Sequence, residues 1–212
     1  MRKIAIILIF SLFPILASAQ ETEVKVKDPM MPKGMIGIKY SYGISNVSMS
    51  QDIETKPAMM PLNLSITYTS YMNLWDIMPY FGLQFEARYS HEGFNSRYLG
   101  NERYTVVDAS IVSQFHLDFA ERFRVLVNIG PYAGYRLTVN RDWNDMDNRF
   151  DYGLYGGAGF AIVFKPFEIH LEGNYKFSLS SYYHPNKLSY DYWLFARPNC
   201  ISISAGIFFH IF

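Results

Sequence analysis

Several titratable residues stand at spacings that could support metal chemistry. His116 with Asp118, and His170 with Glu172, are pairs two residues apart, which puts each pair on one face of a β-strand. Imidazole and carboxylate groups so placed could contribute ligands to a metal ion. Nothing in the sequence shows that the two pairs converge, so hydrogen bonding inside a fold is the preferred interpretation. We therefore expect no metal and no cofactor.

A second set of residues could support hydrolysis or acyl transfer. Ser90, His91 and Glu92 are consecutive, and Ser181 precedes His184 by three positions. A serine nucleophile needs a base within hydrogen-bonding distance. Serine and histidine are common in loops, and no third, orienting group is evident from the sequence. A hydrolase or acyltransferase is kept as an alternative, and we expect that the chain is not an enzyme.

Two further segments have weaker signals. "RDWNDMDNR", Arg141 to Arg149, holds three aspartates that could bind Ca²⁺, but the spacing is not that of an EF-hand, so a solvated acidic loop is preferred. "GLYGGAG", Gly153 to Gly159, resembles a nucleotide-binding loop only superficially, because no βαβ pattern surrounds it.

The elements that carry these residues are predicted to be β-strands. In "LNLSITYTSY", Leu62 to Tyr71, apolar and polar residues alternate, which indicates a strand with one apolar and one polar face. The same pattern recurs in eight segments of the length that a tilted membrane-crossing strand needs. They are 35–44, 62–71, 81–90, 107–117, 123–136, 151–162, 167–177 and 201–211.

The polar face of these segments favours a closed barrel over a water-soluble β-sandwich. It is rich in Gly, Ser and Asn, and its few charges nearly balance, as buried charges must if each is to have a partner. We predict an eight-stranded antiparallel up-and-down transmembrane β-barrel whose polar interior is too narrow for a large channel. The predicted interior charge network comprises Lys39, Glu86, Arg88, Asp108, Arg124, Arg136, Asp151, Glu168, Glu172 and Lys176.

The first residues predict export to the outer membrane. "MRKIAIILIFSLFPILASAQ" has a basic start, an apolar run and small residues before Gln20, which is typical of a cleaved signal peptide. We predict a signal peptide over residues 1–19, a periplasmic segment over 20–33 and a barrel domain over 34–212. Loss of Arg2 and Lys3 would leave 17 basic residues against 19 acidic ones, and this net charge gives no electrostatic reason to expect nucleic acid or anionic lipid as the main partner.

The predicted connections alternate between long and short. The expected long ones are residues 45–60, 91–104, 138–150 and 181–199, and short turns separate them. Outer-membrane barrels have long extracellular loops and short periplasmic turns, so the alternation gives the orientation. The last long loop contains candidate contact residues of types that are enriched at binding hot spots. They are Tyr190, Tyr192, Trp193, Phe195 and Arg197, although an aromatic girdle at the lipid headgroups explains them equally well.

"GPYAGYRL", Gly130 to Leu137, and "FDYGLYGGAGFAIVF", Phe150 to Phe164, resemble the PorT-like outer-membrane β-barrel family of Bacteroidetes. Where many members have Glu-x-Pro, this chain has Asp108 and Ser110. The resemblance implies a small eight-stranded barrel in the outer membrane and a link to protein secretion, and it does not imply an enzyme.

The C-terminal "SAGIFFHIF" is similar to the signal that the barrel-assembly machinery recognises. The expected function is therefore that of a non-catalytic structural or accessory component of the envelope, with binding or adhesion through the outer loops as the alternative. The expected partners are outer-membrane lipid, the barrel-assembly machinery, and secretion-system or envelope proteins.

Overall fold

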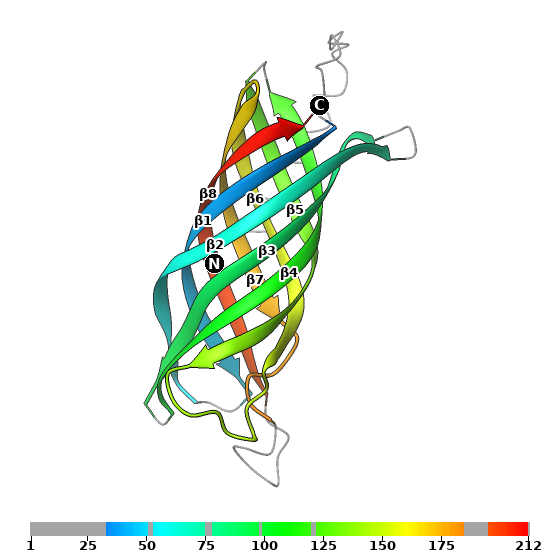
Figure 1. Cartoon of the computed structure of the whole chain (residues 1–212). Helices are drawn as coiled ribbons and strands as arrows, with labels where there is room; N and C mark the ends of the chain where they lie inside the picture. Colours follow the sequence, from blue (N-terminus) through cyan, green and yellow to red (C-terminus); the bar gives the residue numbers. More distant parts are fainter. Residues whose placement is uncertain are drawn as a thin grey trace, which may run out of the picture. The chain divides into compact units, whose positions relative to one another are not determined.

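The computed structural model describes residues 33–50, 53–74, 78–97, 99–119, 122–184 and 195–211. All of these residues belong to one compact unit. Within this part of the chain, eight antiparallel strands form a closed barrel in sequence order, and β8 pairs with β1 (Figure 1). The predicted fold class, an up-and-down eight-stranded barrel, is confirmed. The strands are β1 (Gly34–Met49), β2 (Thr55–Leu74), β3 (Met78–Ser96), β4 (Gly100–Phe119), β5 (Phe123–Val139), β6 (Phe150–Phe164), β7 (Phe167–Ser178) and β8 (Ala196–Ile211).

The predicted signal peptide, and all of the predicted periplasmic segment except Lys33, lie outside the described residues. Among the residues that are described, no helix is long and apolar enough to cross a bilayer.

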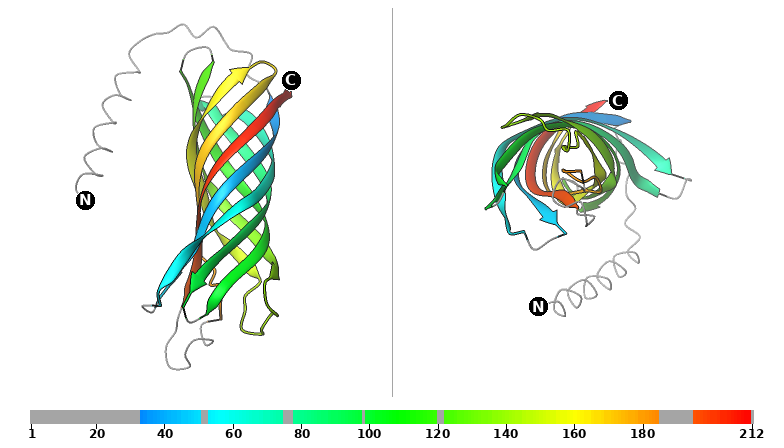
Figure 2. Two further views of the ribbon diagram at one scale, coloured as in Figure 1. Left: turned by 90° about the vertical axis from the view of Figure 1, so that its left-hand side faces the viewer. Right: turned by 90° about the horizontal axis from the view of Figure 1, so that it is seen from below.

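The two ends of the barrel differ. Gly34 pairs with Ile211, so the first and last strands meet at the end that carries the short connections after β2, β4 and β6. We call this the turn side. The opposite end, the loop side, carries the other four connections, and the wall that joins the two ends is a ring of tilted strands (Figure 2).

The prediction of long loops is wrong for two of the four connections. Residues 45–60 and 91–104 are mostly strand, because β1 and β2 continue to a connection at 50–54, and β3 and β4 continue to one at 97–99. Long connections remain only after β5 (140–149) and after β7 (179–195). Half of the loop side is therefore made of strand hairpins that extend the wall.

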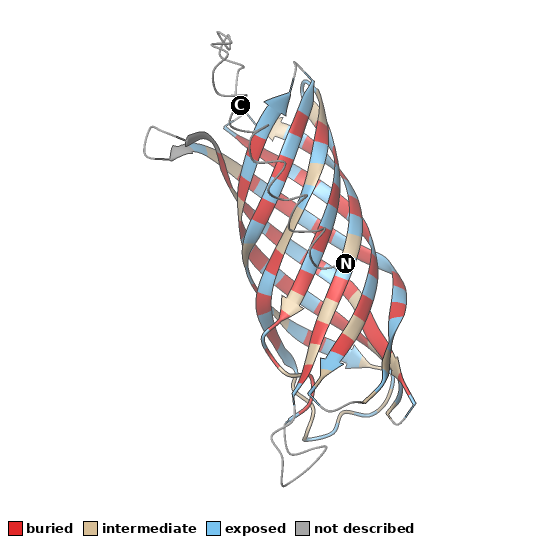
Figure 3. Cartoon of the chain, turned by 180° about the vertical axis from the view of Figure 1, so that it is seen from behind, coloured by how far each residue is buried: buried red, intermediate tan, exposed pale blue. Residues whose placement is uncertain are grey.

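Side chains alternate between the two faces of the wall along every strand (Figure 3). In β1, Ile38 is 64% exposed on the outside, whereas Lys39 next to it is 1% exposed on the inside. Nearer the loop side the polarity inverts: Val47 lies inside and is buried, while Ser48 faces outward and is exposed. The interior is thus polar along most of its length and apolar at the loop side.

The ladder between β2 and β3 is interrupted near the loop side. The register slips between Pro57 and Asn63, so that residues 58–62 of β2 stand opposite residues 91–93 of β3 without ladder pairs. Proline cannot donate a ladder hydrogen bond, and it is tolerated at such irregularities. Pro57 stands at the start of this one and Pro61 lies within it. We call this interruption the β2 break.

Side chains replace the missing backbone bonds at the β2 break. The backbone N–H of His91 donates to Asn63 Oδ1 at 2.9 Å. Ser45 Oγ accepts from the N–H of Gly93 at 2.7 Å and donates to its carbonyl at 2.7 Å. The β3 backbone groups therefore keep partners where β2 leaves the ladder, as buried backbone groups require.

Candidate functional site

The ten charged residues that the sequence assigns to the interior network all lie inside the barrel, and each is at most 8% exposed. They come from β1 and from β3 to β7, which alternate inward and outward and so align these side chains along the barrel axis. The charges form three groups, which we call the turn-side, central and loop-side clusters.

The turn-side cluster is centred on Arg124. Its Nε lies 2.7 Å from Asp118 Oδ1, and its Nη1 lies 3.0 Å from Glu168 Oε1. Glu168 also contacts His170 Nε2 at 3.0 Å and His210 Nε2 at 2.8 Å. Asp118 and His210 were not assigned to the network from the sequence, although their inward parity would have indicated them.

The central cluster is held by Lys39. Its Nζ lies 2.8 Å from Glu86 Oε2 and 3.3 Å from Glu172 Oε2. His170 Nδ1 is 3.5 Å from Glu172 Oε1, so the central cluster is continuous with the turn-side cluster. Because a lone charge is costly to bury, one lysine between two carboxylates, with further polar groups around them, is the expected arrangement.

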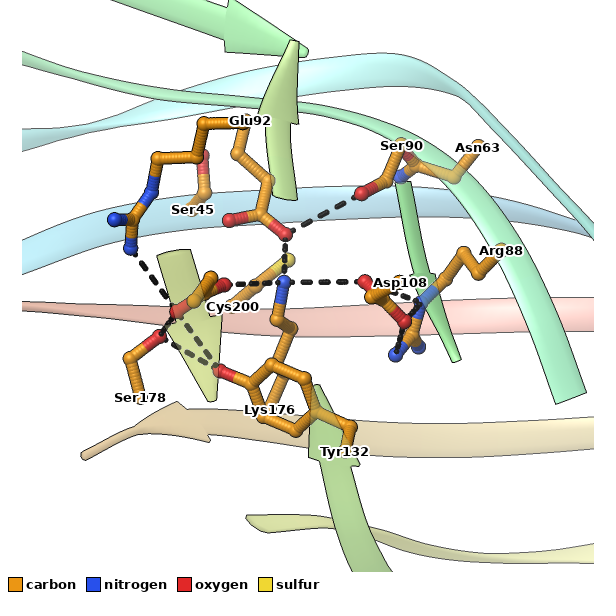
Figure 4. A network of polar contacts seen from close by, with 12 residues as sticks. Ser45, Asn63, Arg88, Ser90, Glu92, Asp108, Tyr132, Lys176, Ser178 and Cys200 are labelled. Atoms are coloured by element: carbon orange, nitrogen blue, oxygen red, sulfur yellow. Dashed lines mark hydrogen bonds and ion pairs between the residues drawn. The ribbon is translucent and has the colours of Figure 1, made fainter. Parts of the chain in front are cut away.

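The loop-side cluster is centred on Lys176 and is drawn in Figure 4. Lys176 Nζ contacts three carboxylates: Glu92 at 2.7 Å, Asp151 at 3.0 Å and Asp108 at 3.3 Å. Glu92, a member of the candidate catalytic set Ser90, His91 and Glu92, belongs to this cluster. Its inward parity continues that of Arg88, which is the signal that could have identified it.

Two arginines complete the loop-side cluster. Arg88 Nη2 lies 2.8 Å from Asp108 Oδ1, and Arg136 Nη2 lies 3.0 Å from Asp151 Oδ1. Arg88 also lies over the ring of Tyr155 at 4.3 Å. Three cations therefore face three carboxylates, and the cluster is close to neutral when every group is ionised.

An aromatic cluster closes the interior at the loop side. It consists of Val47, Phe94, Tyr104, Val106, Tyr182, Tyr183 and Ala196, and we call it the mouth cluster. Tyr182 reaches it from the segment after β7, and its ring packs against those of Phe94 and Tyr104. Burial raises the pKa of Tyr182.

Ion pairs hold the segments over the mouth cluster. Arg141 Nε lies 2.8 Å from Glu102 Oε1, and its Nη1 lies 2.6 Å from Asp147 Oδ2. The hydrogen bond to Asp147 raises the pKa of Arg141, and the bond to Glu102 acts in the same direction. The Tyr182 hydroxyl donates to Glu102 Oε2 at 3.4 Å. Asp147 Oδ2 is thus engaged by Arg141, whereas a Ca²⁺ site would need carboxylate oxygens available to coordinate the metal ion.

Of the serine and histidine candidates at the rim, Ser90 and His91 point to opposite faces of β3. Ser90 faces the interior and bonds to Glu92, whereas His91 faces outward and contacts Thr105 Oγ1 through Nδ1 at 3.2 Å. Ser181 Oγ accepts a bond from the Ala196 N–H at 3.0 Å. The glycine-rich segment 153–159 is part of β6.

The candidate outer-loop contacts are described only in part. Tyr190, Tyr192 and Trp193 lie outside the described residues. Arg197 stacks over the ring of Phe195, with its guanidinium carbon 5.1 Å from the ring centroid. Among the residues that are described, no three or more His, Cys, Asp or Glu side chains are grouped as metal ligands.

Comparisons with known proteins identify the fold. No protein-family model and no curated protein matches the chain, so the PorT-like resemblance stays a prediction. Among solved structures, the outer membrane protein AlkL, studied in DMPC bilayers, is 12% identical with a TM-score of 0.50, over 85% of this chain and 91% of that one.

Ail of Yersinia pestis is 16% identical with a TM-score of 0.48, over 84% of this chain and 99% of that one. OprG of Pseudomonas aeruginosa is 11% identical with a TM-score of 0.48, over 84% and 97%. At such low identity, the likeness to AlkL concerns the fold alone.

Proposed function

We propose that the chain is a non-catalytic β-barrel of the outer membrane, a structural or accessory component of the envelope with a closed interior. The observation that carries the proposal is the pairing of an apolar outer wall with a buried, charge-balanced interior. In a water-soluble barrel the two faces would be reversed, because exposed apolar surface on that scale is unfavourable in water.

The height of the apolar wall supports membrane insertion. In β4 the outward residues run from Phe119 (55% exposed) through Ile111 (50%) to Val107 (41%). At about 3.3 Å per residue and a tilt of roughly 40°, this run spans roughly 30 Å, which is about the thickness of the hydrocarbon core. The long connections after β5 and β7 would then lie on the extracellular side.

The interior supports a closed barrel rather than a pore. A polar pore conducts when mobile water and ions can pass its lining, whereas here each of five interior cations is paired with a carboxylate. Lys39, Arg124 and Lys176 have partners on non-adjacent strands, and Arg88 and Arg136 have theirs on the neighbouring strand. The mouth cluster adds an apolar barrier. Water is disfavoured there because apolar side chains offer it no hydrogen bonds.

A link to secretion is the finer part of the proposal, and it rests on the PorT-like resemblance of residues 130–137 and 150–164. The partners would then be secretion-system or envelope proteins, with the barrel-assembly machinery during biogenesis. The second candidate, binding through the outer loops, is favoured by the stacked pair Phe195 and Arg197, since aromatic and arginine side chains are frequent anchors of interfaces.

The test combines folding, topology and conductance. The folded chain should migrate differently on gels before and after boiling, and protease added to whole cells should cut only in residues 140–149 and 179–195. After reconstitution into planar bilayers it should give no steady channel currents. A freely soluble monomer without a mobility shift would overturn the membrane barrel, and stable ion currents would overturn the closed interior.

A further inference from the structure

The outer wall carries a groove at the loop-side edge of the apolar belt, beside the β2 break. Its volume is about 380 Å³. β2 and β5 contribute its two sides, and β3 and β4 contribute its floor. Its lining includes Pro61, Leu62, His91, Arg103, Thr105 and Thr138.

The groove lies where the wall changes from apolar to polar. On β3, the outward residue Tyr89 is followed two positions later by His91, and on β4, Val107 is preceded by Thr105. Leu62, which is 43% exposed, belongs to the apolar belt on the turn-side flank of the groove. In the proposed membrane orientation this boundary is the level of the lipid headgroups, so the inference rests on the proposed function.

Among the described residues, Arg103 is the only arginine or lysine that lines the groove, and its hydrogen-bond partners there are all uncharged. Nη1 donates to the carbonyls of Phe94 and Glu102 at 3.0 and 2.8 Å, and Nη2 donates to Asn95 Oδ1 at 2.7 Å. A guanidinium has five N–H donors, so two of them, on Nε and Nη2, are left without a protein acceptor in this part of the chain. Such a fork suits two oxygens of one phosphate.

The neighbouring carboxylates are directed to the interior. Glu92 is engaged by Lys176, and Glu102 by Arg141. On the outer face, Lys56 is exposed and pairs across the strands with Asn95, the residue that holds Arg103. Cross-strand partners share a face, so Lys56 adds a second positive charge beside the groove.

Gly93 allows Arg103 to lie across β3. A Cβ atom at Gly93 would collide with the carbonyl oxygen of Glu102 and would meet Arg103 Cδ at 2.9 Å and Met60 Cε at 3.2 Å. His91 and Thr105 supply further polar groups on the same face, joined by their contact at 3.2 Å. The groove thus combines an apolar side, a positive charge and short polar side chains.

We propose that this groove binds the phosphoryl headgroup of an anionic lipid, with the phosphate on Arg103 and the start of an acyl chain against Pro61 and Leu62. The occupant is a membrane lipid rather than free phosphate, because the groove opens onto the belt that faces hydrocarbon. A zwitterionic headgroup fits less well, since its own cation would approach Arg103 and Lys56.

The test is a lipid titration of the detergent-folded barrel, followed by native mass spectrometry. Dioleoyl phosphatidic acid is compared with dioleoyl phosphatidylcholine, and the wild type with Arg103→Gln. We expect phosphatidic acid to be retained preferentially by the wild type, and the variant to bind it roughly tenfold more weakly, the effect of losing a charge-assisted contact. Arg149→Gln, which removes an arginine stacked on Trp143 in the loop after β5, is the matched control and should bind as wild type does.

One further substitution and one competition experiment make the result decisive. Thr138→Trp fills the groove from an exposed position of β5 while Arg103 stays, and it should also weaken phosphatidic acid binding. Inorganic phosphate in large excess should not displace the lipid. Equal retention of both lipids, unchanged binding by Arg103→Gln and Thr138→Trp, or displacement by inorganic phosphate would each overturn the proposal.

The mobility shift on boiling is measured for every sample, because it reports on the barrel independently of the groove. A barrel that shifts normally but does not discriminate between the two lipids overturns the lipid site alone. A chain that shows no shift overturns the membrane barrel itself.

Discussion

The interior and the outer groove treat cations in opposite ways. Inside, Lys176 contacts three carboxylates and is almost inaccessible to solvent. On the outer wall, Arg103 is half-buried, and its contacts within the described residues are with neutral oxygens. A cation enclosed by protein must find its counter-charge within the chain, whereas a cation at a membrane boundary can take it from another molecule. The difference distinguishes charges that maintain the fold from a charge that is available for binding.

The largest effect is expected from removing Lys176, the cation at the centre of the loop-side cluster. Lys176→Met leaves Glu92, Asp108 and Asp151 close together with only two arginines, so the free energy of unfolding should fall by about 3–5 kcal/mol. Urea titration of the heat-modifiable gel band measures this. Lys56→Met, which removes an exposed lysine, should leave the urea midpoint unchanged. Equal midpoints for the two variants would contradict the structural role of the interior charges.

A pair of double-mutant cycles would test the comparison directly. The interior cycle of Arg88→Met with Asp108→Asn should give a coupling energy of about 1.5–3 kcal/mol, because the pair is charged and buried. The outer cycle of Arg103→Gln with Asn95→Ala should give less than about 1 kcal/mol. Similar couplings in the two cycles would remove the distinction between the interior and the groove.

A third prediction concerns the barrier between the interior and the outside water. Cys200, the only cysteine, is buried four residues along β8 from Ala196 of the mouth cluster. Tyr182→Ala should open the cluster and raise the rate of Cys200 alkylation by about tenfold, as expected of easier local opening. Tyr152→Ala, at a position 54% exposed on the outer wall, is the control. An unchanged rate in Tyr182→Ala would mean that other groups close the mouth.

The smallest effect is expected from alkaline pH. Burial raises the pKa of Tyr182, so the folded state keeps its proton after the unfolded state begins to lose it near pH 10. The stabilisation is fully present below that pH and is lost as the pH rises towards the folded pKa. Between about pH 8 and 11, the free energy of unfolding of the wild type should fall by at most about 1.4 kcal/mol more than that of Tyr182→Phe. Urea midpoints at the two pH values measure it, and parallel losses would contradict the assignment.

Alternation predicted the membrane part of the barrel well because one rule holds there: apolar residues outside, polar residues inside. The same parity placed residues such as Glu86 and Arg136 in the interior before any contact was known. The alternation rule failed in residues 45–60 and 91–104, which it predicted to be loops, because at the mouth cluster the apolar residues turn inward. Val47, Phe94 and Tyr104 are apolar and inward, since they pack around Tyr182. Where the alternation continues but the apolar residues face inward, the sequence looks as if the strand had ended.

The contacts themselves could not be predicted. Lys176 and Glu92 are 84 residues apart in sequence, and their meeting depends on the stagger of strands around the ring. The groove depends on the β2 break, which the prolines at 57 and 61 suggest only as a place where a strand is irregular. Arg103 was assigned to a loop, so its position on the outer wall followed only from the structure.

The seam between β1 and β8 has consequences for how the chain acquires its shape. Its register runs without a slip from Gly34 opposite Ile211 to Met49 opposite Ala196, whereas the β1–β2 and β2–β3 ladders both slip. These are the pairings with the greatest separation along the chain, so they carry the largest loop-closure entropy and contribute to slow folding. This unbroken seam is therefore one that a growing polypeptide cannot make until its eighth strand is available, and until then both partner edges stay open to other chains.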